Sequence, residues 1–306
     1  MQFPAMSDAV RLERLQPQQG RVRIVLDTDT FNEIDDQFAV VHALLSPEQL
    51  DVEAIYAAPF FNHNASSAAD GMEKSYEEIL RLLERLDVSP QGLVHRGSTE
   101  FLSGLDDPQD NEAVRDLIER AMASDGEPLY VAAIGAITNV ASAIILQPEI
   151  IERIVVIWLG GHALNWPHTK EFNLKQDLPS AKLVLDCGVP LVLLPCLGVT
   201  SHLLTSGPEV DEHVAPRGAI GQFLAAIFHD HQAQHSALSK VIWDLAATAY
   251  LIDHTWVPTQ IMHSPVLTDQ VTWSTDPTRH LVRVASYVDR DAIFHDLFEK
   301  LKRFSG

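Results

Sequence analysis

Short apolar runs alternate with amphipathic segments along most of the chain, and this alternation limits its fold more than any other feature. The runs have the length of buried strands, and between them apolar residues recur at helical spacing. We expect strands at residues 22–26, 52–57, 129–134, 154–159, 191–194 and 281–286. We expect helices at residues 35–45, 72–86, 139–146, 179–187, 220–235, 244–251 and 291–304. Such an order predicts an α/β fold with a mostly parallel central sheet flanked by helices.

We expect the whole chain, residues 1–306, to form one domain with an N-terminal extension over about residues 1–20. No stretch has the composition of a linker, and 46% of the residues are hydrophobic, which is enough for one large core. In open parallel sheets, ligands bind beyond the carboxyl ends of the strands. We therefore look for function at the loops that follow the predicted strands.

The net negative charge of the chain limits the partners it can have. The sequence has 42 acidic against 22 basic residues, a net charge of −20, which argues against nucleic acid as a partner. No apolar run reaches membrane-spanning length, so we expect no membrane partner, and the first residues lack the apolar core of a secretory signal. Cys187 and Cys196 follow no disulfide or metal-binding spacing, which favours a cytoplasmic location.

Four aspartates lie within ten residues in the segment VLDTDTFNEIDDQF. Asp27 and Asp29 leave the end of the first strand on the same side, since side chains alternate along an extended chain. Asp35 and Asp36 open the next helix, where a single acid could simply cap the first turn. Four neighbouring carboxylates repel one another unless a cation or shared protons relieve them. Ligands that are all oxygen indicate Ca²⁺ or Mg²⁺ rather than zinc.

The same segment resembles the opening DxDPGxDD of the nucleoside hydrolase family, which cleaves the N-glycosidic bond of nucleosides. The spacer here, TFNEI, is two residues longer than in that family and lacks Pro-Gly. Further on, VAAIGAITNVA is similar to the family's VPxGxLTNxA, and LGGHALNWPHTKEFNLKQDLPSA to its MGG…N…EFNxxxDPEAA. VIWDLAATAYLID resembles HDPLAxAYLID, and the likeness extends over about residues 21 to 304. The chain is thus identified as a divergent member, of the inosine/uridine-preferring type.

The resemblance implies a Ca²⁺ ion at the acid cluster. Its ligands would be the side chains of Asp29, Asp36 and Asp244 and the backbone carbonyl of Ile134. Asp27 would stand behind them and fix their positions. Asp35 would act as the base that takes a proton from the attacking water.

The resemblance also implies a site for the sugar. Asn165 and Glu171 would hold the 5′-hydroxyl, Asn173 an inner ribose hydroxyl, and Phe172 would pack against the ring. Amides and a carboxylate suit a polyol, because they can donate to and accept from its hydroxyls. In the loop after the second strand, Asn62 is our choice for a further sugar contact and Asn64 the alternative.

The base side of the site departs from the family. Trp243 stands where many members have a histidine that helps the base leave, and indole cannot donate a proton as imidazolium can. We expect Trp243 to contact the substrate and His231 to be the catalytic acid, with His229 and His235 as alternatives. The partner implied is a small nucleoside or riboside whose base stays open. The family further implies a homodimer or homotetramer.

Two other functions fit parts of the sequence. A nucleoside- or sugar-binding relative could have kept the metal pocket and lost turnover, because Trp243 replaces the proton donor. A haloacid dehalogenase-like phosphatase also places DxD after a strand, but its pattern wants Thr or Val where Phe31 stands. The hydrolase of N-glycosidic bonds is the function we favour.

Overall fold

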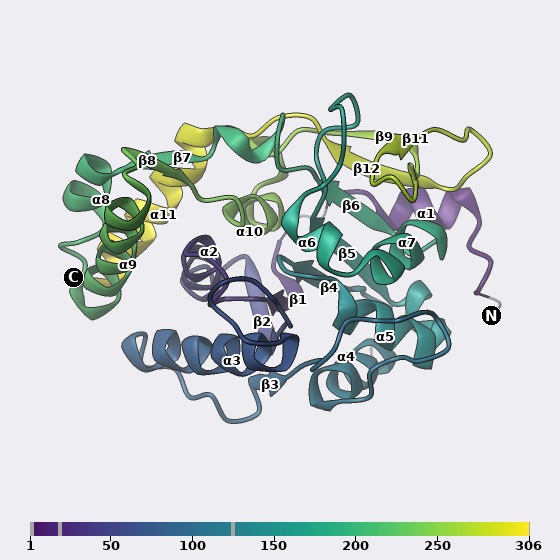
Figure 1. The fold of residues 1–306 in the computed structure, drawn as a ribbon, viewed down its shortest axis with the longest axis horizontal. Coiled ribbons are helices and arrows are strands. Elements are labelled where there is room, and N and C mark those ends of the chain that lie inside the picture. Colours follow the sequence, from purple (N-terminus) through teal and green to yellow (C-terminus); the bar gives the residue numbers. More distant parts are fainter. Residues whose placement is uncertain (1–2, 18–19, 124–125, 306) are drawn as a thin grey trace.

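An eight-stranded sheet forms the centre of the protein, which we describe from a computed structural model over residues 3–17, 20–123 and 126–305 (Figure 1). The strand order is β3-β2-β1-β4-β5-β6-β12-β9, and all neighbours are parallel except β12 and β9. The strands are β1 (Val22–Thr28), β2 (Leu50–Ala57), β3 (Val94–Arg96), β4 (Leu129–Ala133), β5 (Ile154–Leu159), β6 (Leu191–Leu194), β9 (Thr259–His263) and β12 (Leu281–Ala285). The predicted fold class is confirmed.

Helices cover both faces of this sheet. They are α1 (Asp8–Arg14), α2 (Asp35–Leu44), α3 (Ala68–Arg85), α4 (Glu112–Met122), α5 (Thr138–Leu146), α6 (Phe172–Gln176), α7 (Leu178–Asp186), α8 (Gly207–His213), α9 (Gly218–His235), α10 (Leu245–Ile252) and α11 (Arg290–Ser305). Two small antiparallel pairs complete the structure: β7 (Leu204–Ser206) with β8 (Ser239–Val241), and β10 (Val266–Leu267) with β11 (Trp273–Ser274). Helices α8, α9 and α11 gather beside the β7–β8 pair at one end of the molecule (Figure 1).

The central strands are mostly apolar, because both of their faces are buried. Along β1, Ile24 and Leu26 pack in the core on one side of the sheet, and Val25 packs in the core on the other. This is the pattern of a parallel sheet covered on both sides. The last residues of β1 are polar and still buried, so Asp27 and Thr28 must find partners inside the protein.

Several elements differ from the sequence expectation. The helix expected from residue 72 begins at Ala68, where the Ser67 side chain caps its first turn. Helix α4 and strand β3 were not expected. The N-terminal segment packs on the body through Leu15, which is 1% exposed, and through the Arg11 guanidinium, which donates to the Gly188 carbonyl. No helix within the described residues combines the length and the apolar character that crossing a bilayer requires.

Candidate active site

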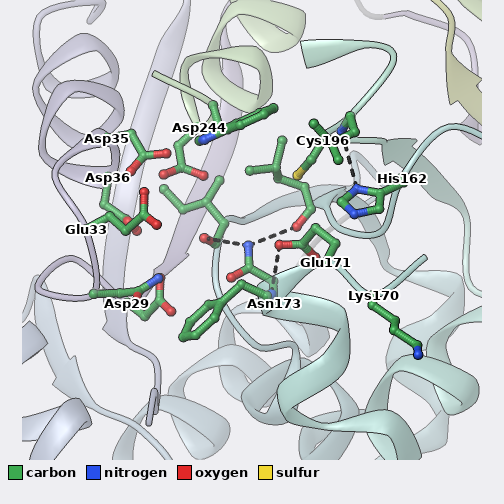
Figure 2. A pocket seen from close by; sticks show the side chains of 16 residues that line it. Asp29, Glu33, Asp35, Asp36, His162, Lys170, Glu171, Asn173, Cys196 and Asp244 are labelled. Carbon is green, nitrogen blue, oxygen red and sulfur yellow. Dashed lines mark hydrogen bonds between the residues drawn. The ribbon is translucent and has the colours of Figure 1, made fainter. Parts of the chain in front are cut away.

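A cavity of about 260 Å³ opens at the carboxyl edge of the sheet, beside the ends of β1, β4, β5 and β6. Figure 2 shows carboxylates on one side of this first cavity, His162 and Cys196 on the other, and Glu171 and Asn173 between them. The lining residues are Asp29, Asn32, Glu33, Asp35, Asp36, Ile134, Leu159, His162, Lys170, Glu171, Phe172, Asn173, Cys196, Leu197, Trp243 and Asp244. Most of the residues expected at the site from the sequence are among them.

Two helix N-termini bring the acids together. Asp35 and Asp36 occupy the first turn of α2, and Asp244 lies directly before α10. One carboxylate oxygen from each of these three residues lies within 4.8 Å of the others. Asp29 follows β1 and faces the same cavity (Figure 2). The four acids expected from distant parts of the sequence therefore share one wall of the cavity.

Burial makes these carboxylates costly to ionise. Burial, and after it the neighbouring charge of Asp35, raises the pKa of Asp36 to about 8. Burial, then the charges of nearby acids, hold the pKa values of Asp29 and Asp244 well above the ordinary range. Both oxygens of Asp29 are buried and make no hydrogen bond to any described residue. A hard divalent cation would satisfy both the unpaired oxygens and the repulsion, so the donor set fits such an ion.

Asp27 lies behind this wall and does not line the cavity. The Asn139 side-chain amide donates to Asp27 Oδ1 at 2.7 Å, and Asn139 Oδ1 accepts from the backbone and hydroxyl of Ser98. Burial raises the pKa of Asp27 to about 7, against the lowering effect of the Asn139 hydrogen bond. The contacts thus fasten the end of β1 to the start of α5.

Glu171, Phe172 and Asn173 line the cavity, and Figure 2 shows Glu171 and Asn173 between its two sides. Glu171 caps α6 by accepting from the backbone amides of Asn173 and Leu174, at 2.8 and 2.9 Å, and it also accepts from Gly161 N at 3.0 Å. Burial raises the pKa of Glu171 to about 7, although these backbone amides lower it. Asn173 Nδ2 donates to the backbone carbonyls of Ile134 and Leu159. Asn173, which we expect to bind the sugar, therefore also holds the Ile134 carbonyl, which we expect to bind the metal.

Besides Asp27, three predicted site residues lie outside the first cavity. Asn165 is exposed in the loop between β5 and α6. Asn62 donates to Asn32 Oδ1 at 2.7 Å, and its own Oδ1 accepts from Asn64 N, so both ends of its amide hold loops together. His231, on α9, lines a second cavity. The roles predicted for these three residues stay predictions.

The second cavity, of about 470 Å³, adjoins the first and shares Asn32 and Glu33 with it. His231 and His235 lie together on its α9 wall, with ring centroids 4.4 Å apart. Lys240 enters from β8; its side chain is 9% exposed, and its ammonium contacts the Glu33 carboxylate. Lys240 Nζ also lies 3.9 Å from Asp35 Oδ1.

Sequence reasoning missed several residues that line these cavities: Asn32, Glu33, His162, Cys196 and Lys240. Asn32 and Glu33 lie in the spacer of the acidic segment, where an unusual length was the only signal. His162 follows the Gly-Gly pair directly, which places it at the end of β5. Lys240 belongs to no motif, so only the fold brings it to the site.

The fold and the site define an α/β protein that gathers carboxylates, amides and aromatic side chains at the carboxyl edge of its sheet, a set that suits a divalent cation together with a polyol. The family model described as inosine-uridine preferring nucleoside hydrolase matches residues 24–295. The chain belongs to this family.

Individual relatives are more distant. The pyrimidine-specific ribonucleoside hydrolase RihA of Escherichia coli O9:H4 (strain HS) is 31% identical over 193 residues, which span 56% of this chain and only 58% of that protein. Among solved structures, an inosine-guanosine nucleoside hydrolase matches with a TM-score of 0.74 at 18% identity, over 92% of this chain and 99% of the other. A purine-preferring ribonucleoside hydrolase from Gardnerella vaginalis matches with 0.71 at 21% identity, over the same shares. At these identities the structures show the common fold.

Proposed function

We propose that this protein hydrolyses the N-glycosidic bond of a nucleoside or a related riboside, with Ca²⁺ as its metal. One observation carries the proposal: the buried cluster of Asp35, Asp36 and Asp244 lines the same cavity as Glu171 and Asn173. Such a cavity offers a cation and hydroxyl-binding groups to one small ligand. Membership of the nucleoside hydrolase family supports the choice of a riboside.

Asp29, Asp36 and Asp244 would hold the ion through their carboxylates, together with the Ile134 carbonyl. A bound Ca²⁺ would supply Lewis acidity and an anchor for two adjacent hydroxyls of the sugar. The unpaired oxygens of Asp29 support its place among the ligands. Asp27 keeps the end of β1 in position through Asn139.

The protein's own groups carry the chemistry. Asp35 takes a proton from the water whose oxygen bonds to C1′, while the bond from C1′ to the base nitrogen breaks and its electron pair stays on the base. Glu171 and Asn173 would bind sugar hydroxyls, and Phe172 would pack against the ring. Asn165 would bind the 5′-hydroxyl from the exposed loop between β5 and α6, and Asn62 would contact the sugar from the loop after β2. Trp243 and His231 would lie on the side of the site that binds the nucleobase.

The test is a panel of nucleosides, other ribosides and other N-glycosides, with free sugar as the readout, in calcium and in chelator. We expect sugar release in calcium, its loss in chelator, and its restoration when calcium is added back. Asp35→Asn is the matched variant, because it removes the proposed base while keeping the carboxylates of Asp29, Asp36 and Asp244. Sugar release that is indifferent to chelator, or to Asp35→Asn, would contradict the mechanism.

A second candidate is a riboside-binding protein without turnover. Trp243 lines the first cavity at the position where many members of the family carry the proton donor, and this favours a loss of catalysis. Calorimetry with ribose and with nucleosides separates the two functions. Binding in calcium with no free sugar would support the binding protein.

Two properties of the whole protein belong to the same proposal. We expect a homodimer or homotetramer, as in the family, and light scattering on a sizing column measures this directly. We also expect a cytoplasmic location, where Cys187 and Cys196, both free and buried, would stay reduced.

A further inference from the structure

The second cavity continues the first on the side of the spacer loop. Because both cavities are lined by Asn32 and Glu33, a ligand anchored in the first can extend past these residues into the second. A riboside whose sugar binds at the acid cluster would then place its base beside the second cavity. This step rests on the function proposed above.

A buried cation lines the second cavity beside Glu33, a residue that the two cavities share. The backbone of Lys240 is fixed by the pairing of β8 with β7, in which Lys240 lies opposite Thr205. Its ammonium contacts Glu33, lies 3.9 Å from Asp35 Oδ1, and lines the second cavity. Glu33 accepts the one side-chain hydrogen bond that Lys240 makes to a described residue. An ammonium has three hydrogens to donate, so Lys240 retains donors for a ligand.

The neighbouring histidine is less suited to provide a positive charge. Burial lowers the pKa of His231, and the charge of Lys240 lowers it further. The imidazole of His231 is therefore neutral near pH 7. Among the described residues that line the second cavity, Lys240 is the one lysine or arginine, and so the one permanent positive charge.

We propose that Lys240 stabilises the departing base by donating a hydrogen bond to it. As the bond from C1′ to the base nitrogen breaks, its electron pair gives the base a negative charge, and the ammonium faces that charge. The water oxygen bonds to C1′, the water proton passes to Asp35, and the base anion takes its proton from solvent. The substrates favoured are ribosides of bases that carry an acceptor atom next to the glycosidic nitrogen, such as the C2 carbonyl of a pyrimidine.

The experiment compares leaving groups that need this help with one that does not. We would measure kcat in calcium for uridine, for inosine and for 4-nitrophenyl β-D-ribofuranoside, whose nitrophenolate is a stable anion without assistance. For Lys240→Met we expect a loss of about 100-fold on both nucleosides, the usual effect of removing one donor to a developing anion, but less than about fivefold on the nitrophenyl riboside. Lys240→Arg should restore most of the nucleoside activity. An equal loss on both substrate classes, or no loss on nucleosides, would overturn the proposal.

Two further variants separate this role from a structural one. Glu33→Gln breaks the ion pair and keeps the cation, so we expect it to retain most nucleoside activity. If Glu33→Gln instead repeats the losses of Lys240→Met on every substrate, the ion pair merely holds the spacer loop and the proposal fails. Lys182→Met is the matched control and should leave kcat unchanged, because Lys182, on α7, forms a surface ion pair with Asp269 and lines neither cavity.

A binding measurement keeps the inference independent of turnover. The free nucleobase 5-nitrouracil loses a proton easily, so it is largely anionic at pH 8 and mimics the departing base. By calorimetry we expect Lys240→Met to bind it about tenfold more weakly than the wild type, as the loss of a charge-assisted hydrogen bond predicts. Equal affinities would overturn the proposal. If the wild type releases no sugar from any riboside, the proposed function fails, and the same measurement still decides the role of Lys240.

Discussion

Replacing Asp244 by Asn should stabilise the metal-free protein while abolishing its response to calcium. The oxygens of Asp35, Asp36 and Asp244 lie within 4.8 Å of one another. At that separation two unit charges repel by about 3 kcal/mol for an effective dielectric constant of about 20. Protons shared among the carboxyls relieve most of this repulsion near neutral pH. We therefore expect Asp244→Asn, which keeps the shape and removes one acid, to raise the free energy of unfolding by about 1 to 3 kcal/mol in chelator.

Thermal unfolding turns this free energy into a measurable shift. An unfolding entropy of about 2.1 cal/mol/K per residue, over the 306 residues of the chain, gives about 0.6 kcal/mol/K. In chelator at pH 8, Tm of the Asn variant should therefore exceed that of the wild type by about 2 to 5 °C. Calcium at about 100 times its Kd should raise Tm of the wild type by about 4 °C, from about 2.7 kcal/mol of binding free energy.

The stability gap between the two proteins should thus close or reverse when calcium is added. We expect calcium to move Tm of Asp244→Asn by less than about 1 °C, because the variant lacks one of the predicted ligands. Differential scanning calorimetry in chelator and in calcium measures all four values. A variant that is less stable than the wild type in chelator, or that responds to calcium as the wild type does, would refute the reasoning.

Three further predictions concern the surroundings of the cluster. Asp35→Asn should keep the calcium shift of Tm and lose about 100- to 10,000-fold in kcat, and loss of the shift would count against its role as base. His42 is buried between α10 and Asp296, and burial lowers its pKa below the ordinary value of about 6.5, against the raising effect of the hydrogen bond that its Nε2 donates to Asp296. Its contribution to stability is then complete above that pH and is lost as the pH falls below it. Between pH 8 and pH 5, Tm should therefore fall less for His42→Asn than for the wild type. An equal fall in Tm for both proteins would contradict this. Asn139→Ala removes the donor to buried Asp27 and should lower the free energy of unfolding by about 1 to 3 kcal/mol in urea titrations.

The elements that build the metal side were predictable because their signals are local. An apolar run, two acids at its end and a helical pattern fix β1 and the start of α2, and parallel strands bring their carboxyl ends to one edge. Helix α4 was missed although Val114, Leu117 and Ala121 lie at helical spacing, because the surrounding residues are mostly polar. Strand β3 has only three residues, which is too short for a pattern to be recognised.

Side-chain roles that depend on distant partners were less accessible. Asn62 was chosen from its loop alone, and its amide holds Asn32 and Asn64 in the structure. The contact between Lys240 and Glu33 joins residues 207 positions apart; Glu33 lies in the spacer of the acidic segment, and Lys240 lies in no motif. Such contacts follow from packing of β8 against the spacer, which no periodicity encodes.

The two departures from the family pattern meet on one side of the site. The long spacer turns back where Asn32 N donates to Asp29 O, and its Glu33 reaches Lys240 at the second cavity. Trp243, in place of a histidine, lines the adjoining first cavity. If Lys240 performs the task of the missing imidazole, then Trp243→His should raise nucleoside kcat of the Lys240→Met variant by about tenfold or more, and raise that of the wild type far less. Steady-state kinetics of the two single variants and the double variant measure this coupling. Equal effects of Trp243→His in both backgrounds would mean that the two residues act independently.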